Sequence, residues 1–133
     1  MSAWWLAVAS LLPVAAMAQD CSPVMPGGRQ LESARFLLGY RAIPGKPAVG
    51  KHFALELAIC PKAGTAAPES VRVDAHMPEH RHGMNYKAQV VAGPGGRYKA
   101  EGLMFHMPGR WEILFDVRSG AKTDRLTQSI VLE

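Results

Sequence analysis

Histidine and methionine side chains gather in two short segments of this chain, and both residue types can bind soft metal ions. The first segment runs from His76 to Met84 and the second from Phe105 to Gly109. Imidazole nitrogen suits borderline metals, while thioether sulfur selects copper, above all Cu(I), over magnesium or calcium. The pattern therefore predicts a copper site. Its candidate ligands are His76, Met77, His80, His82, Met84, His106 and Met107.

A structural explanation of the same residues stays open. The pairs Met77-Pro78 and Met107-Pro108 can form stiff turns in which methionine fills gaps in a core. His76 can equally form a hydrogen bond with Asp74 or with a loop carbonyl group. His52 alternates with apolar residues on a predicted strand, and we expect it to be exposed.

Other metal and catalytic chemistries lack their sequence patterns. A blue-copper site needs a cysteine close to a histidine and a methionine near the chain end, and Cys60-Pro61 has no such neighbours. There is no G-x-S-x-G motif, and the run Gly93 to Gly96 lacks the Lys-Ser/Thr pair of a phosphate-binding loop. Carboxylate pairs such as Asp74 with Glu79 are typical of solvated strand faces. We therefore predict a protein without enzymatic activity.

Residues 1–18 have the properties of a cleaved secretory signal peptide. An apolar run from Ala3 to Ala16 leads into Ala16-Met17-Ala18, which carries small residues where signal peptidase reads the chain. The run is shorter than the roughly 20 apolar residues that a membrane span requires. We therefore expect a mature chain from Gln19, located in the periplasm and without stable membrane insertion.

The chain contains two cysteines, Cys21 and Cys60. In an oxidising compartment an even pair favours a disulfide bond. Such a bond would pin the N-terminal segment to the domain and stabilise it by about 3–4 kcal/mol. A Cys60 thiolate that binds a metal ion is the alternative.

Charge and length indicate one globular domain over residues 19–133. The formal net charge is +4 at pH 7, and the Lys and Arg residues are scattered along the chain. Since no basic stripe with interleaved aromatic residues occurs, we expect no nucleic-acid partner. The mature length is close to the commonest domain size, and no internal repeat or long linker divides it.

Alternation of apolar and polar residues predicts β-strands. It is clearest in residues 52–59, 71–75 and 111–117, and residues 87–91, 97–100 and 126–132 are shorter candidates. Residues 30–40 fit either a helix or a strand. No long amphipathic helix intervenes, so we predict an all-β domain, an immunoglobulin-like antiparallel β-sandwich of about seven strands. Each segment rich in His and Met would then lie at a strand end.

The first of these segments resembles the signature of the YtkA-like domain family. Residues Ala75 to Met84 are similar to its run A-x-M-P-x-H-x-H-G-M, with Arg81 where glycine is often found. Gly96-Arg97-Tyr98, followed by Phe105 to Trp111, is similar to the later run G-x-Y…F-x-M-P-G-x-W. The resemblance covers roughly residues 49–118. It implies an exported β-sandwich, FixH-like in shape, and says little about biochemistry.

These features predict a periplasmic metal-binding protein that stores copper or delivers it to a membrane-bound or periplasmic acceptor protein. The alternative is a metal-free adaptor that docks onto a membrane or periplasmic protein complex through a sheet edge or its methionine-rich rim. A third possibility, a carrier for a small molecule, would require an apolar pocket between the two sheets.

Overall fold

A computed structural model describes Met1 and residues 21–133 of the chain. The predicted signal peptide and its cleavage site therefore lie outside the described residues. No helix in residues 21–133 is long and apolar enough to cross a membrane. The strands are β1 (Arg29–Glu32), β2 (Phe36–Ile43), β3 (His52–Pro61), β4 (Ser70–Met77), β5 (His82–Gly83), β6 (Gln89–Ala92), β7 (Arg97–Met104), β8 (Gly109–Ser119) and β9 (Lys122–Leu132), with one 3-10 turn, η1 (Pro94–Gly96).

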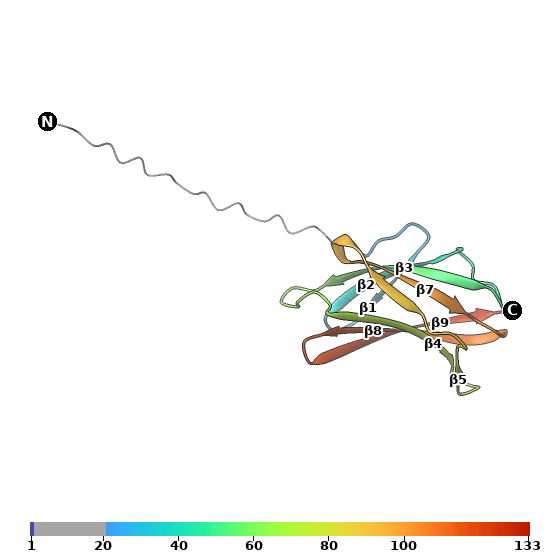
Figure 1. Cartoon of the computed structure of the whole chain (residues 1–133). Coiled ribbons are helices and arrows are strands. Elements are labelled where there is room, and N and C mark those ends of the chain that lie inside the picture. Colours follow the sequence, from blue (N-terminus) through green and yellow to red (C-terminus); the bar gives the residue numbers. More distant parts are fainter. Residues whose placement is uncertain (2–20) are drawn as a thin grey trace.

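The strands form two sheets that pack face to face (Figure 1). One sheet has the strand order β1-β2-β3-β7-β6, and the other has the order β5-β4-β8-β9. All neighbouring strands in these sheets are antiparallel. The predicted all-β sandwich is therefore confirmed.

The core lies between the sheets and follows the alternation seen in the sequence. In β8, the side chains of Trp111, Ile113, Phe115 and Val117 are all buried. Tyr40 of the opposite sheet packs its ring on Phe115, with the ring centroids 5.2 Å apart. Burial of each large apolar side chain stabilises the fold by about 1.5–3 kcal/mol. The inner face of β8 thus holds the two sheets together.

The described residues form more strands than the predicted seven, because two segments each add one. Residues 30–40, which fitted either a helix or a strand, contribute to two strands, β1 and β2. The turn between them is closed by Ser33, whose Oγ accepts a hydrogen bond from the backbone N–H of Phe36 at 3.1 Å. β5 forms where the chain folds back on β4 and pairs His82 with Met77. A strand of two residues is too short to show alternation in a sequence.

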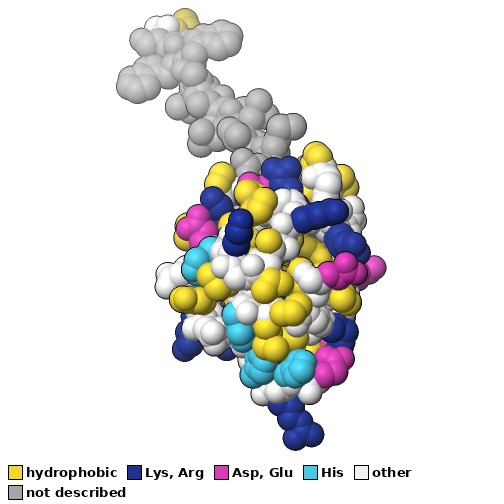
Figure 2. Space-filling model, turned by 90° about the vertical axis from the view of Figure 1, so that its right-hand side faces the viewer, with side chains coloured by type: hydrophobic (Ala, Val, Ile, Leu, Met, Phe, Trp, Pro, Cys, Tyr) yellow, Lys and Arg dark blue, Asp and Glu magenta, His cyan; other side chains and the backbone are white. Residues whose placement is uncertain are grey.

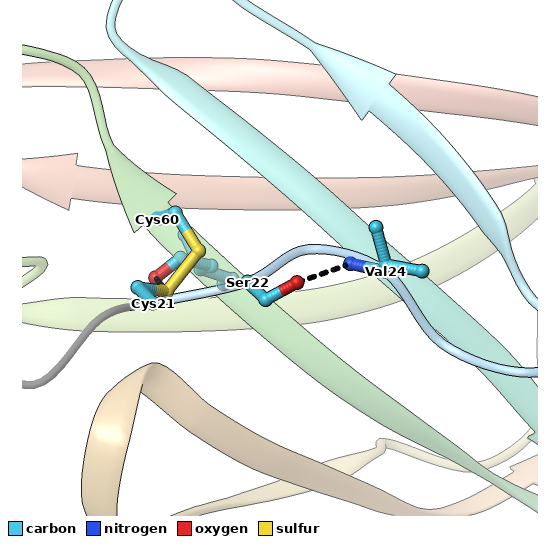
Figure 3. The surroundings of a disulfide bond; sticks show 5 residues. Cys21, Ser22, Val24 and Cys60 are labelled. Carbon is cyan, nitrogen blue, oxygen red and sulfur yellow. Dashed lines mark hydrogen bonds between the residues drawn. A yellow bond between two sulfur atoms is a disulfide. The ribbon is translucent and has the colours of Figure 1, made fainter.

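The predicted disulfide bond joins Cys21 to Cys60, and it ties the N-terminal segment to the end of β3 (Figure 3). The alternative of a Cys60 thiolate metal ligand is therefore wrong, since the sulfur is already bonded. Within the N-terminal segment, the hydroxyl of Ser22 accepts a hydrogen bond from the backbone N–H of Val24 at 3.3 Å. Met25 is buried, so the segment adds a side chain to the interior.

The same segment crosses β2 directly over Gly39, where no side chain would fit. A Cβ atom at Gly39 would lie 1.7 Å from the carbonyl oxygen of Pro23. We expect Gly39→Ala to push the segment away and to lower the free energy of unfolding by about 1–3 kcal/mol. Urea unfolding measures this loss. Gly45→Ala is the control, because nothing lies within 4 Å of a Cβ atom there. An unchanged stability of Gly39→Ala would contradict the packing of the segment on β2.

Asp124 of β9 joins the two sheets through the turn between β1 and β2. Ser33 Oγ donates a hydrogen bond to Asp124 Oδ2 at 2.6 Å, and Arg35 Nε donates one to Oδ1 at 2.8 Å. Arg35 also donates to the backbone oxygen of Ser119 at 3.0 Å. The hydrogen bond from Ser33, followed by those from Arg35, holds the pKa of Asp124 below its usual value.

Asp124→Asn is expected to lower the free energy of unfolding by about 2 kcal/mol at pH 7, because hydrogen bonds to a charged group are weakened. The pKa of Asp124 is lower in the folded state than in the unfolded state. Its contribution is therefore complete above the unfolded value of about 3.9 and is lost as the pH falls through the folded value. Urea unfolding should show a smaller difference between wild type and variant at about pH 3 than at pH 7. Equal differences at both pH values would contradict this account.

Candidate metal centre

The two segments rich in His and Met meet at one end of the sandwich because β4 and β8 are neighbours. β4 ends at Met77, where the chain turns into β5, and β8 begins at Gly109, after the connection from β7. The register pairs His76 with Glu112, so the end of β4 lies beside the start of β8. Figure 2 shows this end of the molecule, where histidine side chains gather next to apolar ones.

Three imidazole rings follow one another here, and we call His80, His82 and His106 the imidazole row. The ring centroids of His80 and His82 are 5.8 Å apart, and those of His82 and His106 are 5.2 Å apart. A nitrogen bound at about 2 Å places its ring centre about 3 Å from the metal, so two rings on one ion stand up to about 6 Å apart. Both spacings fit within this limit. The predicted convergence of the two segments is confirmed.

Trp111 forms the base of the imidazole row. Its ring meets those of His82 and His106 edge to face, with centroid distances of 6.1 Å and 5.4 Å. Phe105 supports the indole from within the core at 5.0 Å, and both aromatic side chains are fully buried. Trp111 Nε1 donates a hydrogen bond to the backbone oxygen of Met107 at 3.0 Å. The indole therefore holds the connection between β7 and β8 against the core.

His106 carries an unsatisfied polar atom. Among the residues that the structure describes, its Nδ1 is the one buried side-chain nitrogen or oxygen without a hydrogen-bond partner. Such an atom costs about 1–3 kcal/mol, and native structures commonly satisfy it. A metal ion bound to Nδ1 would do so.

Two methionines lie close to the imidazole row in the sequence. Met84 lies two positions after His82, so their side chains leave an extended chain on the same side. Met107 follows His106 directly. Both methionines are partly buried and pack against the core. Sulfur and imidazole nitrogen are thus available from both segments.

His76 and Met77 lie on opposite faces of β4, and Met77 is the cross-strand partner of His82. His76 Nε2 lies 3.3 Å from Glu112 Oε1, so its partner is Glu112 instead of the Asp74 considered from the sequence. Met77 is fully buried, and a Cβ atom at Gly109 would lie 2.8 Å from its Cε atom. Met77 therefore occupies a core-filling position. A ligand role for His76 and Met77 stays a prediction, and a metal site at the imidazole row does not need these two side chains.

Within residues 21–133, no three side chains of His, Cys, Asp or Glu are placed to hold one metal ion together. Methionine sulfur is a further ligand type, and Met84 and Met107 are the candidates closest to the row in the sequence. Two imidazoles with one or two thioethers are the ligand types that suit Cu(I). Such a set needs no carboxylate.

Two arginines border the row. Arg81, between His80 and His82, is exposed and has a φ of 52°, a conformation that glycine adopts without steric cost. Arg110 Nε donates a hydrogen bond to Glu79 Oε1 at 2.7 Å. This bond holds the pKa of the Glu79 carboxyl below its usual value. The guanidinium of Arg110 is therefore balanced by a carboxylate, and its charge opposes a bound cation less.

The sequence did not identify Trp111 or Phe105 as part of the site. The alternation of apolar and polar residues predicted a core position for Trp111. The contact of its indole ring with the imidazoles of His82 and His106 depends on the pairing of β4 with β8. His52 is exposed, as predicted, and its ring meets Tyr86 at 4.8 Å.

Comparisons with protein-family models, with curated proteins and with solved structures find no match to this chain. The geometry of the described residues therefore carries the functional argument.

Proposed function

We propose that this protein binds one copper ion, as Cu(I), at the imidazole row and stores or delivers it without catalysing a reaction. His82 and His106 supply nitrogen, and Met84 or Met107 supplies sulfur. The buried, unpartnered Nδ1 of His106 beside a second imidazole is the observation that supports this most strongly. Thioethers are neutral, so two imidazoles and a thioether suit a cation of low charge.

The gradient of exposure along the row favours transfer of the ion. His80 is exposed, His82 is partly buried, and Nδ1 of His106 is shielded from solvent. An ion can therefore arrive at His80, settle between His82 and His106, and leave by the same route. An acceptor protein in the periplasm or its membrane would approach at His80.

The compartment is part of the same proposal. The predicted signal peptide would export the chain, and the disulfide bond suits an oxidising compartment such as the periplasm. Membership of the YtkA-like family remains a proposal that rests on the motif between Ala75 and Met84 and on the β-sandwich.

Fluorescence of Trp111 tests the proposal at the site itself. The other two tryptophans, Trp4 and Trp5, belong to the predicted signal peptide, so the exported chain would contain Trp111 alone. Anaerobic titration of that chain with Cu(I) should change the emission linearly up to one equivalent. His52→Ala should behave like wild type, because His52 lies outside the row. An emission that does not respond to Cu(I), or responds equally in His82→Ala, would contradict the proposal.

A further inference from the structure

A cleft of about 620 Å³ opens between the two sheets, and no residue of the imidazole row lines it. Tyr40 and Leu55 line it from the five-stranded sheet, and Ile113 and Ile130 line it from the four-stranded sheet. The loop that contains residues 45–49 borders it. Its volume lies within the range of roughly 300–1,000 Å³ that is usual for small-molecule pockets.

The depth of the cleft is apolar. Tyr40, Leu55 and Ile113 each expose 6% of their surface or less, so they belong to the core that the cleft reaches. Ile130 and Leu132, nearer the chain end, are half-buried and continue the apolar wall. An alkyl chain placed here would contact core side chains from both sheets.

Basic side chains stand at the mouth of the cleft. Its lining includes Arg29, Arg41 and Lys46, and its acidic groups are the side-chain and terminal carboxylates of Glu133. Arg41 is paired with Glu56, at 2.6 Å. Arg29 and Lys46 are exposed and form no ion pair with a carboxylate in the described part of the chain.

Arg29 lies next to the apolar part of the cleft. It is paired with Tyr40 across β1 and β2. Burial raises the pKa of the Tyr40 phenol, and the charge of Arg29 opposes that rise. A positive charge therefore stands at the point where the apolar wall begins, which is the arrangement that an amphipathic anion requires.

We propose that this cleft binds an amphipathic anion, with its alkyl chain between the sheets and its carboxylate or phosphate head beside Arg29 and Lys46. The ligand class follows from the apolar depth together with the basic side chains of Arg29 and Lys46, which form no ion pair in the described part of the chain. The cleft shares no residue with the imidazole row, so this proposal stands independently of copper binding.

Calorimetric titration of the purified protein with dodecanoate, below its micelle concentration, tests the proposal. Binding should saturate at one ligand per chain, and neutral dodecanol should bind at least about tenfold more weakly because it lacks the charge. The double substitution Arg29→Gln/Lys46→Gln should weaken dodecanoate binding by about tenfold and leave dodecanol binding unchanged. Dodecyl phosphate, tested in parallel, distinguishes a phosphate head from a carboxylate head.

Two further variants keep the test decisive. Arg72→Gln/Lys87→Gln removes the same charge at exposed positions outside the cleft and should leave binding unchanged. Ala42→Phe adds bulk to the lining and should weaken both dodecanoate and dodecanol, with folding checked by urea unfolding. Unsaturable binding, equal affinity for acid and alcohol, or full affinity in the Arg29/Lys46 variant would overturn the proposal.

Discussion

Replacing both cysteines with alanine is expected to lower the free energy of unfolding by about 4 kcal/mol. This is a larger loss of stability than we expect for Gly39→Ala or Asp124→Asn. The bond joins two residues that are 39 positions apart in the sequence. Its loss therefore removes a constraint on a long stretch of the unfolded chain. It also releases the segment that packs over Gly39 and buries Met25. Removing Cys21 and Cys60 together avoids leaving a reactive thiol.

Urea unfolding with and without dithiothreitol measures this effect and supplies its own control. The reductant should destabilise the wild type by as much as the double substitution does and should leave the variant unchanged. Cu(I) affinity should stay the same, because β3 runs from the end near the row, at His52, to the opposite end, at Cys60. A loss of less than about 1 kcal/mol would show that the N-terminal segment is held by its packing alone.

The double substitution His82→Ala/His106→Ala is expected to weaken Cu(I) binding by at least about 100-fold, since changes even to residues that only support a ligand cost about 10–100-fold. It removes the two imidazoles that stand 5.2 Å apart on Trp111. The substitution also removes Nδ1 of His106, which has no hydrogen-bond partner in the folded protein. Because no hydrogen bond of this atom is lost, we expect no loss of stability from this cause.

His52→Ala/His76→Ala is the matched control, because it also removes two imidazoles but touches neither the row nor its thioethers. Its Cu(I) affinity should equal that of wild type. If this control loses affinity while His82→Ala/His106→Ala keeps it, the ion binds at the outer face of β4, where His76 meets Glu112. Competition with a coloured Cu(I) chelator distinguishes these outcomes.

The strands with strong alternation could be predicted from the sequence, because one buried face imposes a period of two. β3, β4 and β8 appear where the pattern placed them, and β7 continues past Ala100 to Met104. The sequence could not decide between a helix and a strand for residues 30–40, because their apolar residues suit both. In the structure, the turn at Ser33 divides this segment between β1 and β2. That turn depends on Asp124, which lies far away in the sequence.

The site could be predicted only in part. The proline-bounded segments predicted two groups of candidate ligands at strand ends, and the pairing of β4 with β8 brings the two segments together. Which side of β4 each residue takes depends on register, and a shift of one residue exchanges the two faces. This register sends Met77 into the core and His76 to the outer face. Periodicity alone could not assign them to a shared site.

Equilibrium competition for Cu(I), under anaerobic conditions and without a polyhistidine tag, tests the central claim most directly. The measurement sets the chain from Gln19 in competition with a chelator of known affinity and counts bound copper per chain. We expect one Cu(I) per chain with a Kd of about 1 nM or tighter at pH 7. A protein that stays metal-free, with a Kd weaker than about 1 μM, would contradict copper binding and would make the imidazole row a structural feature of the strand ends.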